Sequence, residues 1–446
     1  MTLASRMQSW AVFVVSIAVI TMGFGLIVEK DNPRTIGCEV IFDGLVEQAS
    51  ERIGDRVPSN LEEEVQLIAE AVAAIRDLEF TEVPKPAFLS PDELSQRVDT
   101  QVTEEYPDEE AVLDGRLLAA LGAAPRGIDM KQLIGSAYSG AVAGYYDDRT
   151  GEIVVGSRNP GELLSPEDRV TLAHELNHAL TDQTLGLPDH GEDPKAEEDD
   201  GRFAGDALIE GDATLVGYVY GFAALGDEDP RALLGGGEAS EEILASLPHY
   251  LERSVIFPYA EGAEFVCHLY AKEGWDGVNR AYSDLPKSTA AVLFPASHAP
   301  VTAPAEVRTP GSLSEPWQFK ETRGFGAVDV LWLFEAPGGD TAKEVADPFE
   351  HARDWAGGTF SIWTREDKVA LGISLEEKPN GNEMCEGVST WYERSFDDDA
   401  PAERLEGEDL AVSGPVQSAV LRCLGSSILM GIGPDLETAR ALATGG

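Results

Sequence analysis

The sequence predicts an α+β fold with a mainly helical core, a small sheet, a C-terminal α+β domain and an N-terminal transmembrane helix. Three observations lead to this prediction. Apolar residues recur at helical spacing through 61–80, after Ser165 and through 202–225. Residues 141–156 have the apolar pattern and central turn of a β-hairpin. After residue 303, strand-like and helix-like segments are mixed, which is typical of an α+β domain.

Four segments follow from these patterns. Residues 1–36 are expected to form a signal anchor and residues 37–130 a helical N-terminal region. Residues 131–302 are expected to form the core, and residues 303–446 the C-terminal domain, which begins with a Pro/Gly-rich linker. Beyond the anchor, a chain of about four hundred residues is long enough for two or three domains with sizeable apolar cores.

The first segment contains an uncharged, mostly apolar run from Trp10 to Val28, at the lower end of the length that spans a bilayer as a helix. A short leader with Arg6 precedes this run, and no A-x-A cleavage site follows it. We therefore expect an uncleaved single-pass anchor with the rest of the chain outside the cytoplasm. Secretion after signal cleavage is the alternative.

The N-terminal region is predicted to be helical. Asn60 is a suitable N-cap for a helix over Leu61–Phe80, and Glu63 completes a capping-box pattern. One or two further helices are expected between Pro91 and about Leu121. In the core, the hairpin is expected to pair Ala141–Asp147 with 152–156.

The sequence carries an H-E-x-x-H motif at residues 174–178. Because residues four apart on a helix share one face, His174 and His178 can bind the same metal ion. Glu175 lies beside them, where it can accept a proton from a water molecule activated by the metal. Zinc suits this site, since it accepts imidazole and carboxylate ligands and leaves one position for water. Ser165 as N-cap and Pro166 at the first helical position predict the helix.

A third ligand is expected on the second core helix. Glu210 lies among small and apolar residues, where a carboxylate is costly unless it is paired or binds metal. Asp206 and Asp212 are the alternatives, as ligands or as partners of a histidine's other nitrogen. Two surface histidines on an ordinary helix would be the simplest interpretation, but the apolar residues around the motif argue against it.

These residues resemble the glutamate-type H-E-x-x-H zinc metallopeptidases, the gluzincins. The closest likeness is to a group of largely uncharacterised prokaryotic metallopeptidase-like proteins that are secreted or membrane-anchored. The resemblance extends from about residue 132 to 298 and is carried by four motifs: HELNHALTDQ at 174–183, ALIEGDA at 207–213, PYAEGAEFV at 258–266, and Ser288-Thr289 followed by LFP at 293–295.

The resemblance implies a zincin-like core that hydrolyses peptide bonds as a zinc metalloendopeptidase. By this likeness His174, His178 and Glu210 are the Zn²⁺ ligands, and Glu175 is the general base. The implied partners are a protein or peptide substrate and, through the N-terminal helix, a membrane. One departure is Phe294, which stands where the similar proteins have histidine, and it puts activity or specificity in question.

The resemblance also suggests which residues contact a substrate. The strand containing 144–146 is expected either to bind the substrate backbone as an added strand or to serve only in sheet packing. A residue that stabilises the tetrahedral intermediate is expected to be His or Tyr. Tyr259 is the preferred candidate, and His268 and His298 are the others.

The sequence leaves two alternatives to a zinc metallopeptidase. A catalytically weak, zincin-fold binding or scaffold protein at the cell surface is the main alternative, and a zinc hydrolase of non-peptide bonds is another. The net charge of −47, with 80 acidic and 33 basic residues, opposes nucleic-acid binding and is typical of a highly soluble surface. The acidic loop 187–201 is expected to be solvated, with a second cation site as an alternative.

The four cysteines allow two disulfide bonds outside the cell. Cys385 and Cys423, both in the C-terminal region, form the pair we expect. Cys267 lies in an apolar helical pattern and is expected to be a small buried residue.

Overall fold

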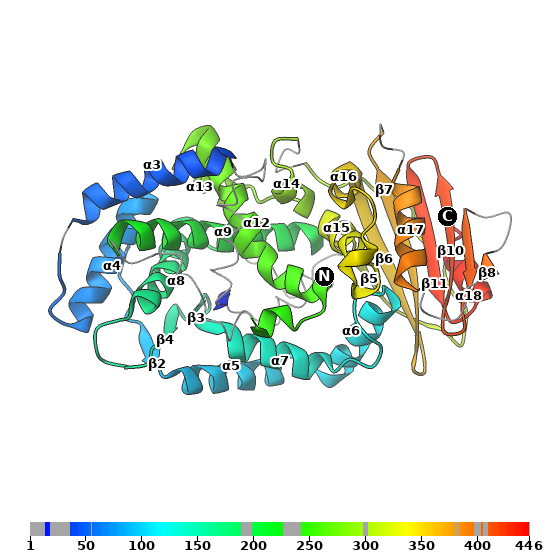
Figure 1. The fold of residues 1–446 in the computed structure, drawn as a ribbon, viewed down its shortest axis with the longest axis horizontal. Helices are drawn as coiled ribbons and strands as arrows, with labels where there is room; N and C mark the ends of the chain where they lie inside the picture. The colour runs from blue at the N-terminus through cyan, green and yellow to red at the C-terminus, as the bar shows by residue number, and fades with distance from the viewer. Residues whose placement is uncertain are drawn as a thin grey trace.

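The computed structural model describes residues 14–17, 36–54, 56–188, 199–225, 242–297, 302–379, 381, 383–396, 403–404 and 409–445. The α+β prediction is confirmed for these parts of the chain, which combine many helices with a four-stranded and a seven-stranded sheet. Figure 1 shows the helical part and the small sheet on one side of the molecule and the larger sheet at the other end. Buried apolar residues form a large cluster that continues from the helices into the larger sheet.

The N-terminal region contains helices α3 (Ile36–Ile53), α4 (Leu61–Arg76), α5 (Pro91–Glu105) and α6 (Asp108–Ala120). Helix α7 (Met130–Ala141) follows at the start of the core. The predicted start of α4 is confirmed, since the side chain of Asn60 accepts a hydrogen bond from the backbone N–H of Glu63. The prediction that this helix extends to residue 80 is wrong. The helix ends at Arg76, because Asp77 adopts a left-handed conformation with φ of 59°.

The small sheet contains the predicted hairpin, which is confirmed as the antiparallel pair β3 (Val142–Asp147) and β4 (Glu152–Gly156). Two further strands were not predicted. Strand β2 (Ala87–Leu89) pairs parallel to β4, and strand β1 (Val14–Ile17) pairs antiparallel to β3. The strand order is β1-β3-β4-β2, so β3 lies between β1 and β4.

The core helices are α8 (Pro166–Leu185), α9 (Asp199–Ala224), α12 (His249–Glu273), α13 (Trp275–Ser283) and α14 (Thr289–Leu293). The predicted cap of α8 is confirmed, because the side chain of Ser165 accepts a hydrogen bond from the N–H of Asp168. Its C-terminal end is at Gly186, whose φ of 78° is favourable for glycine. Helix α9 begins three residues earlier than expected.

The larger sheet has the strand order β5-β6-β7-β11-β10-β9-β8. Its strands are β5 (Gln318–Gly324), β6 (Trp355–Arg365), β7 (Lys368–Glu377), β8 (Glu403–Arg404), β9 (Leu410–Ser413), β10 (Ser418–Leu424) and β11 (Ser427–Gly433). Helices α15 (Ala327–Glu335), α16 (Pro348–Asp354), α17 (Met384–Ser395) and α18 (Leu436–Leu442) pack around it. Strands β6 and β7 form an antiparallel pair, and the mixture of strands and helices expected after residue 303 is confirmed.

A buried ion pair joins the N-terminal helices to the larger sheet. Nη1 of Arg323, in β5, lies 3.0 Å from Oδ1 of Asp114, in α6, and neither side chain is more than 1% exposed. The hydroxyl of Tyr106 donates a second hydrogen bond to Asp114, at 2.9 Å. This contact fixes the sheet against the helical part.

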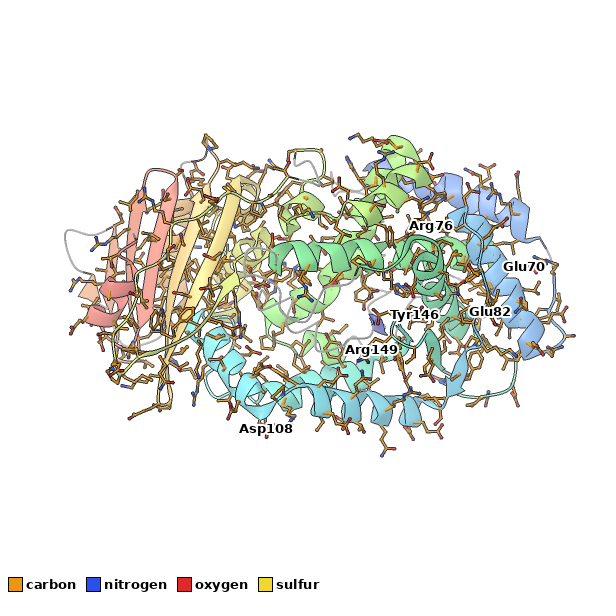
Figure 2. The ribbon with its side chains drawn as sticks, turned by 180° about the vertical axis from the view of Figure 1, so that it is seen from behind. Glu70, Arg76, Glu82, Asp108, Tyr146 and Arg149 are labelled. Atoms are coloured by element: carbon orange, nitrogen blue, oxygen red, sulfur yellow. A yellow bond between two sulfur atoms is a disulfide. The ribbon has the colours of Figure 1, made fainter. Side chains whose placement is uncertain are left out.

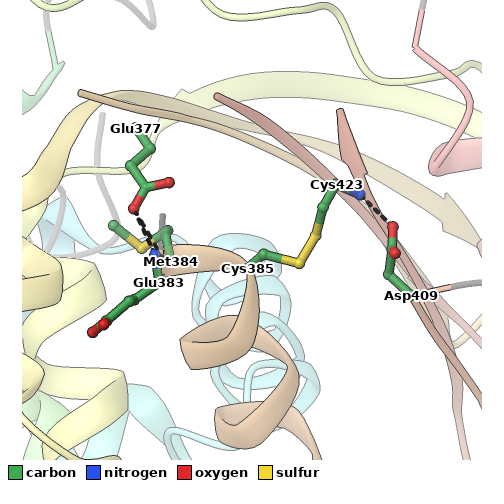
Figure 3. Close-up of a disulfide and its surroundings, with 6 residues drawn as sticks. All are labelled: Glu377, Glu383, Met384, Cys385, Asp409 and Cys423. Carbon is green, nitrogen blue, oxygen red and sulfur yellow. Dashed lines mark hydrogen bonds between the residues drawn. A yellow bond between two sulfur atoms is a disulfide. The ribbon is translucent and has the colours of Figure 1, made fainter. Parts of the chain in front are cut away.

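Two disulfide bonds are present. The predicted bond between Cys385 and Cys423 is confirmed, and it ties α17 to β10 (Figure 3). The expectation that Cys267 is only a small buried residue is wrong. It is buried, but it is bonded to Cys38 and thereby joins α12 to α3 across 229 positions of sequence. Apolar periodicity marks the position as buried but gives no information on a partner so far away.

In the part of the chain that the structure describes, no helix combines the length and the hydropathy needed to cross a membrane. Only Val14–Ile17 of the predicted span Trp10–Val28 is described, and these four residues form strand β1. The remainder of the predicted span lies outside the described residues.

Candidate metal centre

Three side chains from two adjacent helices converge inside the core. His174 and His178 lie one turn apart on α8, and Glu210 lies on α9, which packs against α8. Nε2 of His174 is 3.2 Å from Oε2 of Glu210 and 2.9 Å from Nε2 of His178. Nε2 of His178 is 3.5 Å from the same glutamate oxygen. The three ligand atoms form a compact, buried triangle.

This triangle fits a zinc ion. With zinc–ligand distances of 2.0–2.1 Å and tetrahedral angles, neighbouring ligand atoms are expected about 3.3 Å apart. The observed separations are 2.9, 3.2 and 3.5 Å. Two histidines and a carboxylate are also a ligand set that zinc accepts. The three residues can therefore hold a metal ion, with a fourth position left for water or substrate.

Burial keeps both histidines in the form that binds metal. The loss of hydration lowers the pKa of His174 to about 4 and that of His178 to about 3. Both imidazoles are therefore neutral near pH 7, with a lone pair available on one ring nitrogen. Burial also raises the pKa of Glu210, while its hydrogen bond to His174 acts in the opposite direction.

Two tyrosines lie close to Glu210. The hydroxyl of Tyr259, in α12, donates a hydrogen bond to the glutamate, and its ring centroid is 6.3 Å from that of His174. Tyr138, in α7, is buried, and its pKa is raised by loss of hydration and by the negative charges of Glu210 and Asp206. A hydrogen bond from Tyr259 fixes the carboxylate in the orientation that faces the histidines.

The other two candidates for stabilising the tetrahedral intermediate do not join the group. His268 lies nine residues beyond Tyr259 on α12, about 13 Å further along the helix axis by its rise per residue. His298 lies outside the described residues, as does most of the acidic loop 187–201, the alternative location of a second cation site.

Glu175 faces strand β3. A Cβ atom added to Gly144 would lie 3.1 Å from Oε1 of Glu175 and 2.9 Å from both Cγ2 of Thr171 and the carbonyl oxygen of Val154. Glycine is therefore required for the strand to approach the carboxylate this closely. The side chain of Glu175 is buried, one helical position from a ligand histidine, and next to the backbone of β3.

No protein-family model matches this chain, and no similar protein was found among curated proteins or solved structures.

Asp212, an alternative third ligand, is engaged elsewhere. Both of its oxygens lie 3.0 Å from Nε of Arg76, in α4, and the hydroxyl of Tyr282 donates to it at 2.9 Å. All three side chains are buried, and the guanidinium of Arg76 also lies over the ring of Trp275. Figure 2 shows Arg76 on its helix. The charge of Asp212 acts on His178 through space and raises its pKa against the larger effect of burial.

Glycines allow α9 and α12 to cross in close contact. A Cβ atom on Gly211 would lie 2.1 Å from the carbonyl carbon of Gly262, and one on Gly262 would lie 2.2 Å from the carbonyl oxygen of Ala207. Gly211 is the residue after Glu210, and Gly262 is three residues after Tyr259. The crossing therefore brings Tyr259 to the glutamate that it orients.

Other motif residues hold the core together. Gln183 accepts hydrogen bonds from the N–H groups of Thr81 and Glu82, and Asp182 accepts one from the hydroxyl of Tyr146 in β3. These bonds fix the C-terminal half of α8 against the chain before β2 and against β3. Near the start of α9, Asp200 accepts hydrogen bonds from both the N–H and the hydroxyl of Thr289.

Phe294 packs against α16. It is buried at the end of α14, with its ring centroid 4.5 Å from that of Phe349, and the guanidinium of Arg353 lies over its face. Both neighbours belong to α16, so this position connects the core to the helices beside the larger sheet.

Two contributors to this site could not be predicted from the sequence. Arg76 is a single basic residue at the end of an amphipathic helix, a position where arginine is common on protein surfaces. Tyr138 is one of many aromatic residues at helical spacing. Only the packing of distant helices reveals their positions.

Proposed function

We propose that this protein is a zinc-dependent metalloendopeptidase with a zincin-like core, acting on protein or peptide substrates outside the cytoplasm. The observation that carries this proposal is the buried convergence of His174, His178 and Glu210, with Glu175 beside them. Two neutral imidazoles and a carboxylate that converge in a buried position offer lone pairs to a metal ion. Glu175 lies one helical position from a ligand histidine, where its carboxylate can act as the general base.

Each residue has a chemical role in the proposed reaction. When bound, zinc would lower the pKa of a water molecule and polarise the substrate carbonyl. Glu175 accepts the proton of the attacking water at a carboxylate oxygen and then donates it to the nitrogen of the leaving amine. Tyr259 keeps Glu210 in place, and β3 offers backbone N–H and C=O groups to an extended substrate beside Glu175.

The extracytoplasmic location is supported by the two disulfide bonds, because such bonds persist in oxidising compartments. We propose a single-pass anchor over the run Trp10–Val28, with secretion after signal cleavage as the alternative. The net charge of −47 is consistent with a soluble catalytic part.

The test measures metal content and cleavage in the full-length chain, solubilised in mild detergent. We expect a single zinc ion per chain and cleavage of an unstructured protein such as reduced casein. Glu175→Gln is expected to retain zinc and lose cleavage, whereas the exposed, matched control Glu109→Gln retains both. Glu210→Ala is expected to lose zinc. Absence of bound metal in the unaltered chain would refute the proposal.

A catalytically weak binding or scaffold protein with the same fold is the second candidate. It is favoured by Phe294, which packs against α16 and stands where the metallopeptidase-like proteins that the motifs resemble have histidine. Zinc bound at His174, His178 and Glu210 without cleavage of any unstructured protein would identify this alternative.

A further inference from the structure

Strand β1 occupies the edge of the small sheet beside the metal centre. It runs antiparallel to β3, and its residues Val14, Val15 and Ser16 stand opposite Tyr146, Tyr145 and Gly144. Figure 1 shows β1 as a short dark-blue arrow next to β3, and Figure 2 shows the same strand near Tyr146 from behind. Without β1, β3 would be the edge strand of this sheet.

The pairing covers the part of β3 that faces the catalytic carboxylate. Ser16 stands opposite Gly144, and a Cβ atom on Gly144 would lie 3.1 Å from Oε1 of Glu175. The position of β3 is fixed on the other side, since the hydroxyl of Tyr146 donates to Asp182 of α8 at 2.6 Å. The regular pairing is interrupted between Ser16 and Ile17, directly after the residue opposite Gly144. An extended substrate that adds to β3 would need the backbone groups that β1 uses.

We propose that residues 14–17 are a built-in occupant of the substrate edge, and that this edge accepts extended apolar segments running antiparallel to β3. The preference of this edge for apolar segments is inferred from its occupant, because three of the four residues of β1 are β-branched and apolar: Val14, Val15 and Ile17. Main-chain hydrogen bonds give such an added strand its affinity. That this edge binds substrate rests on the proposed peptidase function, whereas the pairing of β1 with β3 does not.

An occupant on the same chain competes more effectively than a free peptide, because its effective concentration is high. If β1 leaves the edge free a tenth of the time, the apparent dissociation constant of a substrate rises about tenfold. The same residues lie within the run predicted to span a membrane. A segment cannot be a strand on β3 and a bilayer-spanning helix together, so membrane insertion would free the edge for substrate.

The first experiment measures hydrogen exchange in the full-length Glu175→Gln chain, in which binding is separated from cleavage. Proline at positions 15 and 16 removes two N–H donors and fixes φ, which breaks the pairing. In this V15P/S16P variant we expect faster exchange in the 142–147 peptide than in the parent. The matched control V15A/S16A keeps both donors and is expected to exchange like the parent. Equal exchange in the proline variant and the parent would overturn the occupancy of the edge by β1.

The second experiment measures binding of a fluorescent peptide with the sequence of residues 12–19 to the same chains. We expect about tenfold tighter binding to V15P/S16P than to V15A/S16A, because the competitor has been removed. The same peptide with glutamate at its valine positions is expected not to bind. Equal affinity for both chains, absence of binding to both, or equal binding of the glutamate peptide would overturn the proposal. If the apolar peptide binds as expected but the chain with Glu175 intact cleaves nothing, the peptidase function fails and the docking edge stands.

Discussion

Gly144 controls how closely β3 approaches Glu175. A methyl group at this position would lie 3.1 Å from the carboxylate and 2.9 Å from the Val154 carbonyl oxygen, so either the strand or the side chain has to move. We expect Gly144→Ala to retain zinc but to lower kcat/KM by about 100-fold, since displacement of a catalytic group by about 1 Å has an effect of this size.

The control for this substitution is Gly44→Ala, where a Cβ atom meets nothing within 4 Å. Zinc content and cleavage of an unstructured protein are the measurements. Normal activity in Gly144→Ala would show that β3 does not determine the position of Glu175.

The ion pair of Arg76 and Asp212 provides a second test at the level of single residues. Arg76→Met leaves a buried carboxylate without its partner, and loss of one member of such a pair costs about 3–5 kcal/mol. Urea unfolding is the measurement. Arg56→Met is the matched control, because Arg56 pairs with Glu70 on the surface, where such pairs contribute at most about 1 kcal/mol.

A double variant tests whether the unpaired charge of Asp212 causes the loss of stability. Arg76→Met combined with Asp212→Asn removes the unpaired charge, and we expect it to recover part of the lost stability. If Arg76→Met alone unfolds at the same urea concentration as Arg56→Met, Asp212 does not depend on Arg76.

Among the elements, the crossing of α9 and α12 determines whether Tyr259 reaches Glu210. Adding a methyl group to Gly211 or Gly262 brings it within 2.3 Å of backbone atoms, which do not move as a flexible side chain can. We expect Gly262→Ala to separate the helices, to destabilise the protein by about 3 kcal/mol and to weaken zinc binding.

The control is Gly217→Ala, in α9 where it packs against α8. A Cβ atom at this position would lie 3.5 Å from Cβ of His174, which is an ordinary contact. Thermal unfolding and competition for zinc with a chelator are the measurements. Unchanged zinc affinity in Gly262→Ala would show that the crossing is not needed to orient Glu210.

The elements also show what local sequence can predict. The starts of α4 and α8 were predicted correctly because Asn60 and Ser165 act on groups only three residues away. The hairpin was predicted because its two strands and its turn are contiguous. The assembly of His174 and His178 with Glu210 was expected from the motifs and from the cost of burying a lone carboxylate.

Long-range pairings could not be predicted in the same way. Strands β1 and β2 are short, and their partners β3 and β4 lie far away in sequence, so nothing local distinguishes them from other apolar residues. The same reason applies to the bond between Cys38 and Cys267, whose partners are 229 positions apart.

For the whole molecule, this disulfide bond joins the first described helix to α12, which carries Tyr259. A bond that closes so long a loop restricts the unfolded chain strongly. We expect Cys38→Ser/Cys267→Ser to lose about 2–5 kcal/mol of unfolding free energy. Chemical denaturation under non-reducing conditions is the measurement, and Cys385→Ser/Cys423→Ser, with a loop of 38 positions, is expected to lose less.

The junction between the core and the larger sheet contains buried carboxylates, which link stability to pH. Asp200 accepts bonds from Thr289, and Asp329 accepts bonds from Gly326 and Tyr250. Burial is the main cause that raises the pKa of Asp200 to about 7 and that of Asp329 to about 6. Asp200 joins α9 to α14, whose Thr289 hydroxyl in turn accepts a hydrogen bond from the N–H of Val328 in α15. Asp329 joins α12 to the start of α15 through Tyr250.

The sign of the effect follows from proton binding. Between about pH 4 and pH 7 the unfolded chain has released these protons, since the pKa of an unperturbed aspartate is about 3.9, while the folded protein still holds them. The folded state therefore binds more protons in this window, and its stability from these groups falls as the pH rises from about 4 to 7. Asparagine does not titrate, so we expect Asp200→Asn to reduce this fall in stability. The control is Asp276→Asn, at an exposed position, which is expected to leave the fall unchanged. Urea unfolding at intervals across the window measures the slope, and an equal slope in Asp200→Asn and the unaltered chain would show that Asp200 is ionised throughout. This junction holds the sheet against the helices that carry the ligands. Its destabilisation as the pH rises would therefore disturb the metal centre through α9, which carries Glu210.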